Sequence, residues 1–361
     1  MVREMKQQRR LRRAKTSGRI KKIGQGLLSL IIATAMCLQV SGAVAQPAQA
    51  PMKAKDNPTK TAKEKAALCP SHQAGPVVLT KVANDIYVRK GAQDIFRAEN
   101  LAAIANVGII IGKTSIAVID TGGSYCDGKR ILTAIRQLSD KPISHVINTH
   151  SHPDHVFGNA AFEGESPTFV GHQGLARAMR ERGGHYLDNL ERLVGIENMA
   201  GTKIIPPTRE VKTTLTLNLG ERPLLLEAHK TAHTNHDLTV FDPQSKILFA
   251  GDLLFHKHTP VLDGSLKGWL TLMQDMQKIP AKQVVPGHGG PLLPWPAALK
   301  PQQAYFQNLA KDIKAILKSG GTMAEAQQRA GKAQRQSWLL FKEYNARNAA
   351  AAFAELEWDV E

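Results

Sequence analysis

Hydrophobic and polar positions along residues 77–320 follow two different periods. Short apolar or alternating runs typical of strands occur before residue 120 and again after residue 213, as in "GIIIGKTSIAVID", "TLTLNL", "LTVFD" and "KILFAGD". Elsewhere the spacing is helical: Ile131, Ile135 and Leu138 share one face of "GKRILTAIRQLS", and "LKGWLTLMQDMQKI" and "PQQAYFQNLAKDIKAILKSG" are also helical. Two groups of strands, each interrupted by helices, predict an α/β sandwich with the helices outside.

The first 76 residues differ from the rest of the chain. Residues 1–45 hold ten Lys or Arg and one acidic residue, and include a mostly apolar run, Leu27–Leu38, that is too short to span a bilayer. Ala43 and Ala45 then form an A-x-A site, so we predict a signal peptide that is cleaved after Ala45 and a periplasmic or secreted protein. The alternative is that this segment stays uncleaved and anchors the protein to the membrane, and we expect no other contact with a membrane. Residues 46–76, rich in Ala, Lys, Pro and Gln, predict a flexible linker.

Charge and cysteine content narrow the function classes. The formal net charge is +16, but residues 1–45 carry +9 of it, and the remaining +7 gives no reason to expect nucleic-acid binding. Once residues 1–45 are removed, Cys69 and Cys126 are the cysteines that remain. In an oxidising compartment they are a candidate disulfide, and two unpaired thiols are the alternative.

The segment "THSHPDH" places three histidines and an aspartate within six positions, directly after the strand-like "SHVIN". His150 and His152 are two residues apart at the end of an extended segment, so we expect their side chains to point to the same side. Pro153 ends the strand, and Asp154 and His155 in the following turn can point elsewhere. Imidazole and carboxylate groups are ligands that suit Zn²⁺. The cluster therefore predicts two neighbouring metal positions.

Three further candidate ligands lie where strands begin or end. His233 precedes a strand in "AHTNHDLTVF", Asp252 follows a glycine at the end of "KILFAGD", and His288 lies in the glycine turn of "QVVPGHGG". Together with the first cluster they make seven candidates, enough for two metal ions and an open position for water.

These motifs are the signature of the metallo-β-lactamase superfamily, which the chain closely resembles from about Val77 to Lys318. "THSHPDH" matches its H-x-H-x-D-H motif, "AHT" its third histidine, "AGD" its bridging aspartate and "PGHG" its last histidine. The resemblance implies an α/β (α+β) fold over residues 77–320, the four-layer αββα sandwich, with metals at the edge between two sheets. We expect residues 321–361 to form a C-terminal helical extension, packed on the domain through Phe353 and Trp358.

The resemblance also implies two Zn²⁺ ions per chain and a role for each candidate residue. The implied roles are ligands of the first ion (His150, His152, His233), ligands of the second ion (Asp154, His155, His288), a bridging ligand (Asp252) and a supporting carboxylate in "AVIDTGG" (Asp120).

By the same resemblance the protein is a hydrolase in which a metal-bound water, oriented by Asp154, attacks an ester, thioester, lactone or amide of a small molecule. "LDGSLKGWL" and "PWPAAL" are similar to segments of the exported zinc metallohydrolases of the quinoprotein relay system, which implies a periplasmic quinoprotein as a partner. Three alternatives stay open: an iron-dependent persulfide dioxygenase, a β-lactamase, and a non-catalytic quinoprotein accessory protein.

Other polar residues have no fixed role at this point. His236 stands where many superfamily members have Asp, and contact with metal or substrate is one alternative for it. We expect a solvated loop at His256 and His258, and polar helical stretches at His172 and His185. A further group of basic residues predicts either recognition of an anionic substrate or a solvated helix face: Arg177, Arg180, Arg182 and Arg192.

Overall fold

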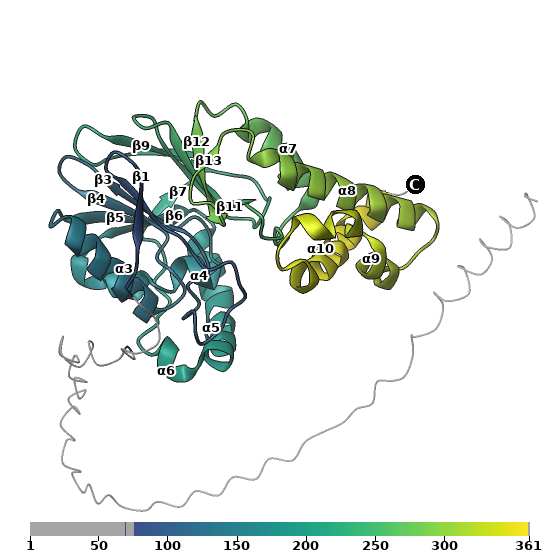
Figure 1. The fold of residues 1–361 in the computed structure, drawn as a ribbon, viewed down its shortest axis with the longest axis horizontal. Helices are drawn as coiled ribbons and strands as arrows, with labels where there is room; N and C mark the ends of the chain where they lie inside the picture. Colours follow the sequence, from purple (N-terminus) through teal and green to yellow (C-terminus); the bar gives the residue numbers. More distant parts are fainter. Residues whose placement is uncertain (1–68, 70–75, 360–361) are drawn as a thin grey trace, which may run out of the picture. The chain divides into compact units, whose positions relative to one another are not determined.

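The computed structural model describes Cys69 and residues 76–359 (Figure 1). The predicted signal peptide, residues 1–45, and nearly all of the predicted linker, residues 46–76, lie outside the described residues. In the described part of the chain, none of the helices combines the length and the apolar character needed to cross a membrane.

Seven strands form the first sheet, in the order β1-β2-β3-β4-β5-β6-β7. The pairs from β1 to β4 are antiparallel and those from β4 to β7 are parallel. β3 and β4, separated by the predicted break at "GKT", are buried along their whole length because both faces of the sheet are covered. The strands are β1 (Leu79–Ala83), β2 (Ile86–Arg89), β3 (Val107–Ile111), β4 (Ile116–Ile119), β5 (Ile143–Ile147), β6 (Thr168–His172) and β7 (Arg209–Val211).

Six strands form the second sheet, in the order β13-β12-β11-β10-β9-β8. Its pairs are antiparallel except β11 with β12, whose parallel pairing brings their carboxyl ends to one edge. The strands are β8 (Thr214–Asn218), β9 (Pro223–Ala228), β10 (Leu238–Asp242), β11 (Ile247–Phe255), β12 (Gln283–His288) and β13 (Leu293–Pro294).

The helices fall into two groups in the sequence. Those before the second sheet are α3 (Tyr125–Leu138), α4 (Pro153–Val156), η1 (Asn159–Glu165), α5 (Leu175–Val194) and α6 (Ile196–Met199). Those that follow β11 are α7 (Leu266–Met276), α8 (Leu299–Lys318), α9 (Met323–Arg329), η2 (Lys332–Ser337), α10 (Phe341–Leu356) and η3 (Glu357–Asp359).

Hydrophobic cores separate the four layers. Ile109 and Ile110 are neighbours on β3 and point to opposite faces: Ile109 packs with Ile131 of α3, and Ile110 joins Leu226 in the core between the sheets. On the outer face of the second sheet, strand β11 packs against α7 and α8, with Trp269 at the centre. The predicted α/β sandwich with helices on both outer faces is confirmed, and Figure 1 shows α3 to α6 on one side and α7 to α10 on the other.

Two details of the predicted packing are wrong. Leu138 is 42% exposed at the last residue of α3, beyond the part of the helix that buries Ile131 and Ile135. Trp358 is 84% exposed in η3, past the end of α10, so it does not dock the C-terminal segment. Phe353 is buried as expected. Polar contacts also fix α10, because the Tyr305 hydroxyl of α8 donates a 2.9 Å hydrogen bond to Asn345 Oδ1.

Cys69 and Cys126 form a disulfide, with their Cα atoms 5.4 Å apart. Of the two alternatives for these cysteines, the structure has the bonded one. The bond links the segment before β1 to the first turn of α3, a covalent tie across 57 positions of the sequence.

Candidate metal centre

The histidine-rich segment lies between β5 and α4. β5 ends at Ile147, so His150 and His152 lie in the loop that follows and not on an extended strand as we predicted. They nevertheless converge: His150 Nε2 is 3.0 Å from His152 Nδ1. Asp154 and His155 lie in the short helix α4, which starts at Pro153, and their side chains are directed to a second position as expected.

The other three candidate ligands come from the second sheet. His233 lies in the loop between β9 and β10, Asp252 in β11 and His288 at the end of β12. Because β11 and β12 are parallel neighbours, Asp252 and His288 reach the same edge. The approach is so close that a Cβ on Gly287 would lie 1.9 Å from Asp252 Oδ1, which explains the glycine of "PGHG". The structure thus brings all seven predicted residues together.

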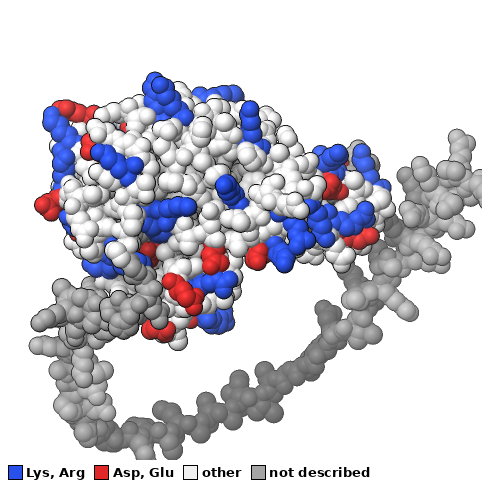
Figure 2. All heavy atoms as spheres, in the orientation of Figure 1, with Lys and Arg blue, Asp and Glu red and all other residues white. Residues whose placement is uncertain are grey.

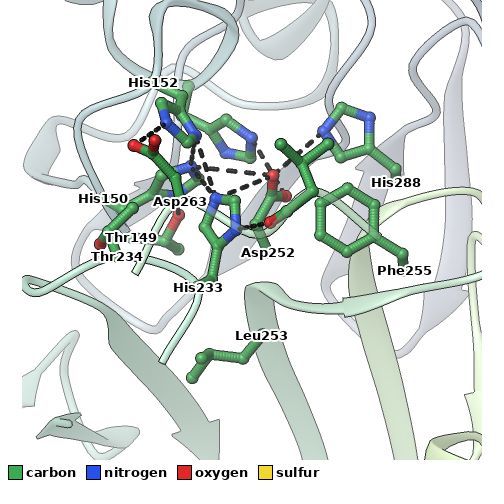
Figure 3. Close-up of polar contacts among 12 residues, drawn as sticks. Thr149, His150, His152, His233, Thr234, Asp252, Leu253, Phe255, Asp263 and His288 are labelled. Carbon is green, nitrogen blue, oxygen red and sulfur yellow. Dashed lines mark hydrogen bonds and ion pairs between the residues drawn. The ribbon is translucent and has the colours of Figure 1, made fainter. Parts of the chain in front are cut away.

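The seven side chains form two groups with Asp252 between them. In the first, His233 Nε2 lies 3.2 Å from His150 Nε2 and 3.0 Å from His152 Nδ1 (Figure 3). In the second, His288 Nε2 lies 3.2 Å from Asp154 Oδ2, and His155 Nε2 lies 3.5 Å from the same oxygen.

Asp252 touches both groups. Its Oδ2 is 3.5 Å from His233 Nε2 and 3.3 Å from His288 Nε2, and its Oδ1 is 3.2 Å from His155 Nε2. A carboxylate in this position is within reach of two cations at once.

The outer nitrogen of each histidine in the first group has a partner that fixes its proton there. His233 Nδ1 donates to the Val261 carbonyl at 2.7 Å, and His152 Nε2 lies 3.3 Å from Asp263 Oδ2. His150 Nδ1 lies 3.1 Å from Thr149 Oγ1. The three inner nitrogens therefore turn their lone pairs toward one another, which is unfavourable unless a cation lies between them.

Metal binding fits this arrangement. Three nitrogens in a tetrahedral shell around Zn²⁺ would be about 3.3 Å apart, since Zn–N bonds are about 2.0–2.1 Å, and the observed separations are 3.0–3.2 Å. In the second group His155 Nε2 and Asp252 Oδ1 are buried, and their 3.2 Å contact with each other does not have hydrogen-bond geometry, so neither atom has a hydrogen-bond partner among the described residues. Buried polar atoms of this kind are otherwise rare in folded proteins. Both groups suit a divalent cation.

Burial and the carboxylates set the charge of these histidines. Burial lowers the pKa of His233 to about 3 although Asp252 opposes this, so the imidazole is neutral, as a metal ligand must be. Burial also lowers the pKa of His288, but the carboxylates of Asp252 and Asp154 outweigh it and raise that pKa to about 9. The second position is therefore one where positive charge is strongly stabilised.

Asp120 supports the site as the sequence predicted. Its Oδ2 accepts hydrogen bonds from His155 Nδ1 and from Thr149 Oγ1, both at 2.8 Å, and its Oδ1 accepts from the Thr149 amide at 2.8 Å. The carboxylate thereby holds His155 in the tautomer that turns Nε2 inward and also fixes the residue before His150.

We expect Asp120→Asn to weaken metal binding at the second position by about 10- to 100-fold, because a partner that orients a ligand typically has an effect of that size. The dissociation constant is measured by competition with a chromophoric chelator. Asp140→Asn, a change at an exposed aspartate, is the control. Equal affinity in both variants would contradict the role assigned to Asp120.

The remaining histidines have different surroundings. His236 lies at the site edge: its Nε2 is 2.7 Å from Ser151 Oγ and its Nδ1 is 2.6 Å from Asn235 Oδ1, so it joins the two ligand-bearing loops. His258 is buried against His288 and Tyr344, so the expected solvated loop is wrong there, and His256 is half-buried. His172 is a buried residue of β6 and not of a helix, whereas His185 is exposed on α5 as expected.

A pocket of about 180 Å³ opens onto the two groups. Its floor includes His152, Asp154 and His288, and its apolar walls include Phe96 and Ile104. Its other wall is made by α5 and α10, through Tyr186, Asn189, Leu190, Tyr344 and Arg347.

Sequence reasoning missed Asp263, Tyr344 and Arg347. Asp263 stands in the quoted "LDGS" but has no period or ligand spacing that marks it, and Arg347 follows 59 positions after His288.

The fold and the site define a metallohydrolase, and the chain belongs to the metallo-beta-lactamase superfamily, whose family model matches residues 102–288. Members of this superfamily are hydrolases. The seven candidate metal ligands fall within that range, whereas the pocket residues Phe96, Tyr344 and Arg347 lie beyond it.

Two curated proteins are similar to parts of the chain. A linear primary-alkylsulfatase of Pseudomonas sp. (strain ATCC 19151) is 42% identical over 50 residues, which is 14% of this chain and 10% of that protein. The human acyl-coenzyme A thioesterase MBLAC2 is 26% identical over 188 residues, which is 46% of this chain and 61% of the thioesterase. The chain therefore spans only part of the length of either relative.

Solved structures share the fold. A metallo-beta-lactamase from Pontibacter korlensis superposes with a TM-score of 0.53 at 23% identity and covers 64% of this chain and 99% of its own. The protein TMB-1 has a TM-score of 0.51 at 20% identity and covers 65% of this chain and 98% of its own. At these identities the likeness establishes the fold alone.

Proposed function

We propose that this protein is a zinc-dependent hydrolase that cleaves an ester, thioester, lactone or amide bond of a small molecule. The observation that carries the proposal is the position of Asp252 between two groups of ligand-type side chains at the floor of a pocket. His150, His152 and His233 would hold one ion, Asp154, His155 and His288 the other, and Asp252 would contact both.

When bound there, a divalent cation supplies Lewis acidity and makes water acidic enough to ionise near neutral pH. The residues of the chain do the rest. Asp154 lines the pocket, and its carboxylate accepts a hydrogen bond from the attacking water and orients it. Phe96 and Ile104 exclude bulk water from the opposite wall and bind the apolar part of the substrate. No serine nucleophile is needed, because water is the attacking group. Ser151 is also inaccessible to a substrate, since its Oγ is buried against His236.

The human thioesterase relative favours an activated carbonyl as the reacting centre. We further propose that the protein is exported, which the disulfide between Cys69 and Cys126 supports because such bonds persist in oxidising compartments. We also propose a periplasmic quinoprotein as a partner, and this proposal rests on the motifs "LDGSLKGWL" and "PWPAAL".

The test is metal analysis of the purified full chain by mass spectrometry, followed by a panel of esters, thioesters, lactones and amides. Two zinc ions per chain and turnover of one of these bonds support the proposal. Iron together with persulfide oxidation would replace it by a dioxygenase, and nitrocefin as the single substrate turned over would replace it by a β-lactamase. A zinc-loaded protein that is inert toward the panel but co-purifies with a quinoprotein would show an accessory role.

A further inference from the structure

Two arginines from distant parts of the chain converge on Asp263, and one of them, Arg347, lines the pocket. Arg182 Nη1 of α5 lies 2.9 Å from Asp263 Oδ2, and Arg347 Nη2 of α10 lies 3.0 Å from Asp263 Oδ1. The same Oδ2 is 3.3 Å from His152 Nε2. One carboxylate thus joins the two guanidinium groups to a metal-ligand histidine.

The charges at this point do not cancel. Asp263 carries one negative charge and faces two guanidinium groups that stay protonated at any physiological pH. The side chains of Arg182 and Arg347 are 53% and 56% exposed, whereas that of Asp263 is 17% exposed. Each guanidinium group has five N–H donors, and their contacts with Asp263 use one of them each, while Arg182 also hydrogen-bonds to Tyr186. The two half-exposed arginines therefore have an excess positive charge and further donors beside the pocket that Arg347 lines.

The position of Arg347 is fixed by contacts between α10 and the loop that follows β11. Asn348 Nδ2 donates to the Pro260 carbonyl at 2.6 Å, and Asn348 Oδ1 accepts from the Leu262 amide at 2.9 Å. Further along the helix, Glu355 accepts from the Leu266 amide at 2.6 Å at the start of α7. An arginine held on a helix in this way is preorganised for binding.

This local arrangement differs from the general surface. On the face shown in Figure 2, Lys and Arg are scattered over the molecule among fewer Asp and Glu. Arg177, on the same helix as Arg182, is 78% exposed and pairs with Glu181 as a solvated helix face would. The two alternatives that the sequence left for the α5 arginines therefore separate. Arg177 lies on a solvated helix face, whereas Arg182 pairs with Asp263, the carboxylate that also holds the pocket-lining Arg347.

We propose that Arg182 and Arg347 form an oxyanion-binding subsite, so that the preferred substrate carries a carboxylate or phosphate group a few bonds from the scissile carbonyl. The inference rests on the proposed hydrolase function. Guanidinium groups bind both oxyanions through paired hydrogen bonds. The short distance follows because a single imidazole ring, that of His152, separates Asp263 from the inner nitrogens of the site. The apolar part of the substrate would lie against Phe96, Ile104 and Leu190.

The test uses three thioesters with acyl chains of equal length that end in a carboxylate, a phosphate or a neutral primary amide. With the zinc-loaded full chain we expect kcat/KM for one or both anionic members to exceed that for the amide by about 10- to 100-fold, the range expected for charge-assisted hydrogen bonds. Arg347→Met and Arg182→Met should bring the ratio of kcat/KM between the anionic members and the amide close to 1, mainly by raising KM for the anionic members. Arg177→Met is the matched control and should keep the preference.

The outcomes separate this inference from the proposed function. Equal turnover of all three thioesters would overturn the subsite and leave the hydrolase intact. A parallel loss for anionic and neutral substrates in Arg347→Met would show a merely structural role and would also overturn it. If no thioester is cleaved, calorimetry with adipate, a dicarboxylate, decides: binding that is lost in the Arg182 and Arg347 variants supports the subsite, and equal binding in all variants contradicts it.

Discussion

Replacing Asp252 by Asn should reduce kcat by at least about 1,000-fold and remove one or both metal ions. Asp252 is buried, with its oxygens 3.2–3.5 Å from His155, His233 and His288. Asparagine has nearly the same shape but lacks the negative charge, so the repulsion between two neighbouring cations is no longer offset. Loss of a metal ligand also removes transition-state stabilisation, and three powers of ten correspond to about 4 kcal/mol.

The measurement pairs kcat on the best substrate of the panel with metal content per chain. Asp275→Asn on α7 is the control: its carboxylate is 63% exposed and pairs with Lys278 away from the site. Because the variant side chain has the same size as aspartate, circular dichroism should show an unchanged fold. A folded Asp252→Asn protein with two zinc ions and near-normal turnover would contradict the assignment of the site.

The period of the hydrophobic pattern explains why the layers could be predicted from the sequence. Buried strands such as β3 and β4 are continuous apolar runs, and α3 has one apolar face, so local patterns and the final fold agree. The ligands could be predicted for a related reason. They stand in segments that follow or precede strands, or beside a glycine in β11 and β12. In an α/β fold the carboxyl ends of neighbouring parallel strands meet at one edge of the sheet.

The residues that the sequence did not reveal depend on contacts between distant segments. Asp263 acquires its role from Arg182, Arg347 and His152, which lie 81, 84 and 111 positions away in the sequence. No local period carries that information. His258 shows the same limit, because a polar loop sequence gives no sign that Tyr344 of α10 covers the ring. The residues around the metal ligands are thus positioned by tertiary packing, whereas the ligands themselves could be predicted from sequence motifs.

Removal of the metal should lower the free energy of unfolding by about 4 kcal/mol for each ion present at 1,000 times its dissociation constant. The reason lies in the inner face of the site. His150, His152 and His233 direct three lone pairs at one point, and His155 Nε2 and Asp252 Oδ1, although 3.2 Å apart, are buried without a hydrogen bond. A cation satisfies these groups, and without it their burial opposes folding. In a chain of this size, the loss corresponds to a fall in Tm of about 6–7 °C per ion.

Calorimetry of the zinc-loaded protein, and of the same protein after chelation and dialysis, measures the change in Tm. Readdition of Zn²⁺ should restore the original value, which separates loss of the ion from damage by the chelator. Asp252→Asn provides a second comparison, because a protein that already lacks part of its metal should respond less to the chelator. Identical transitions before and after chelation would mean that the seven side chains are satisfied without a cation, and the metal centre would then have to be abandoned.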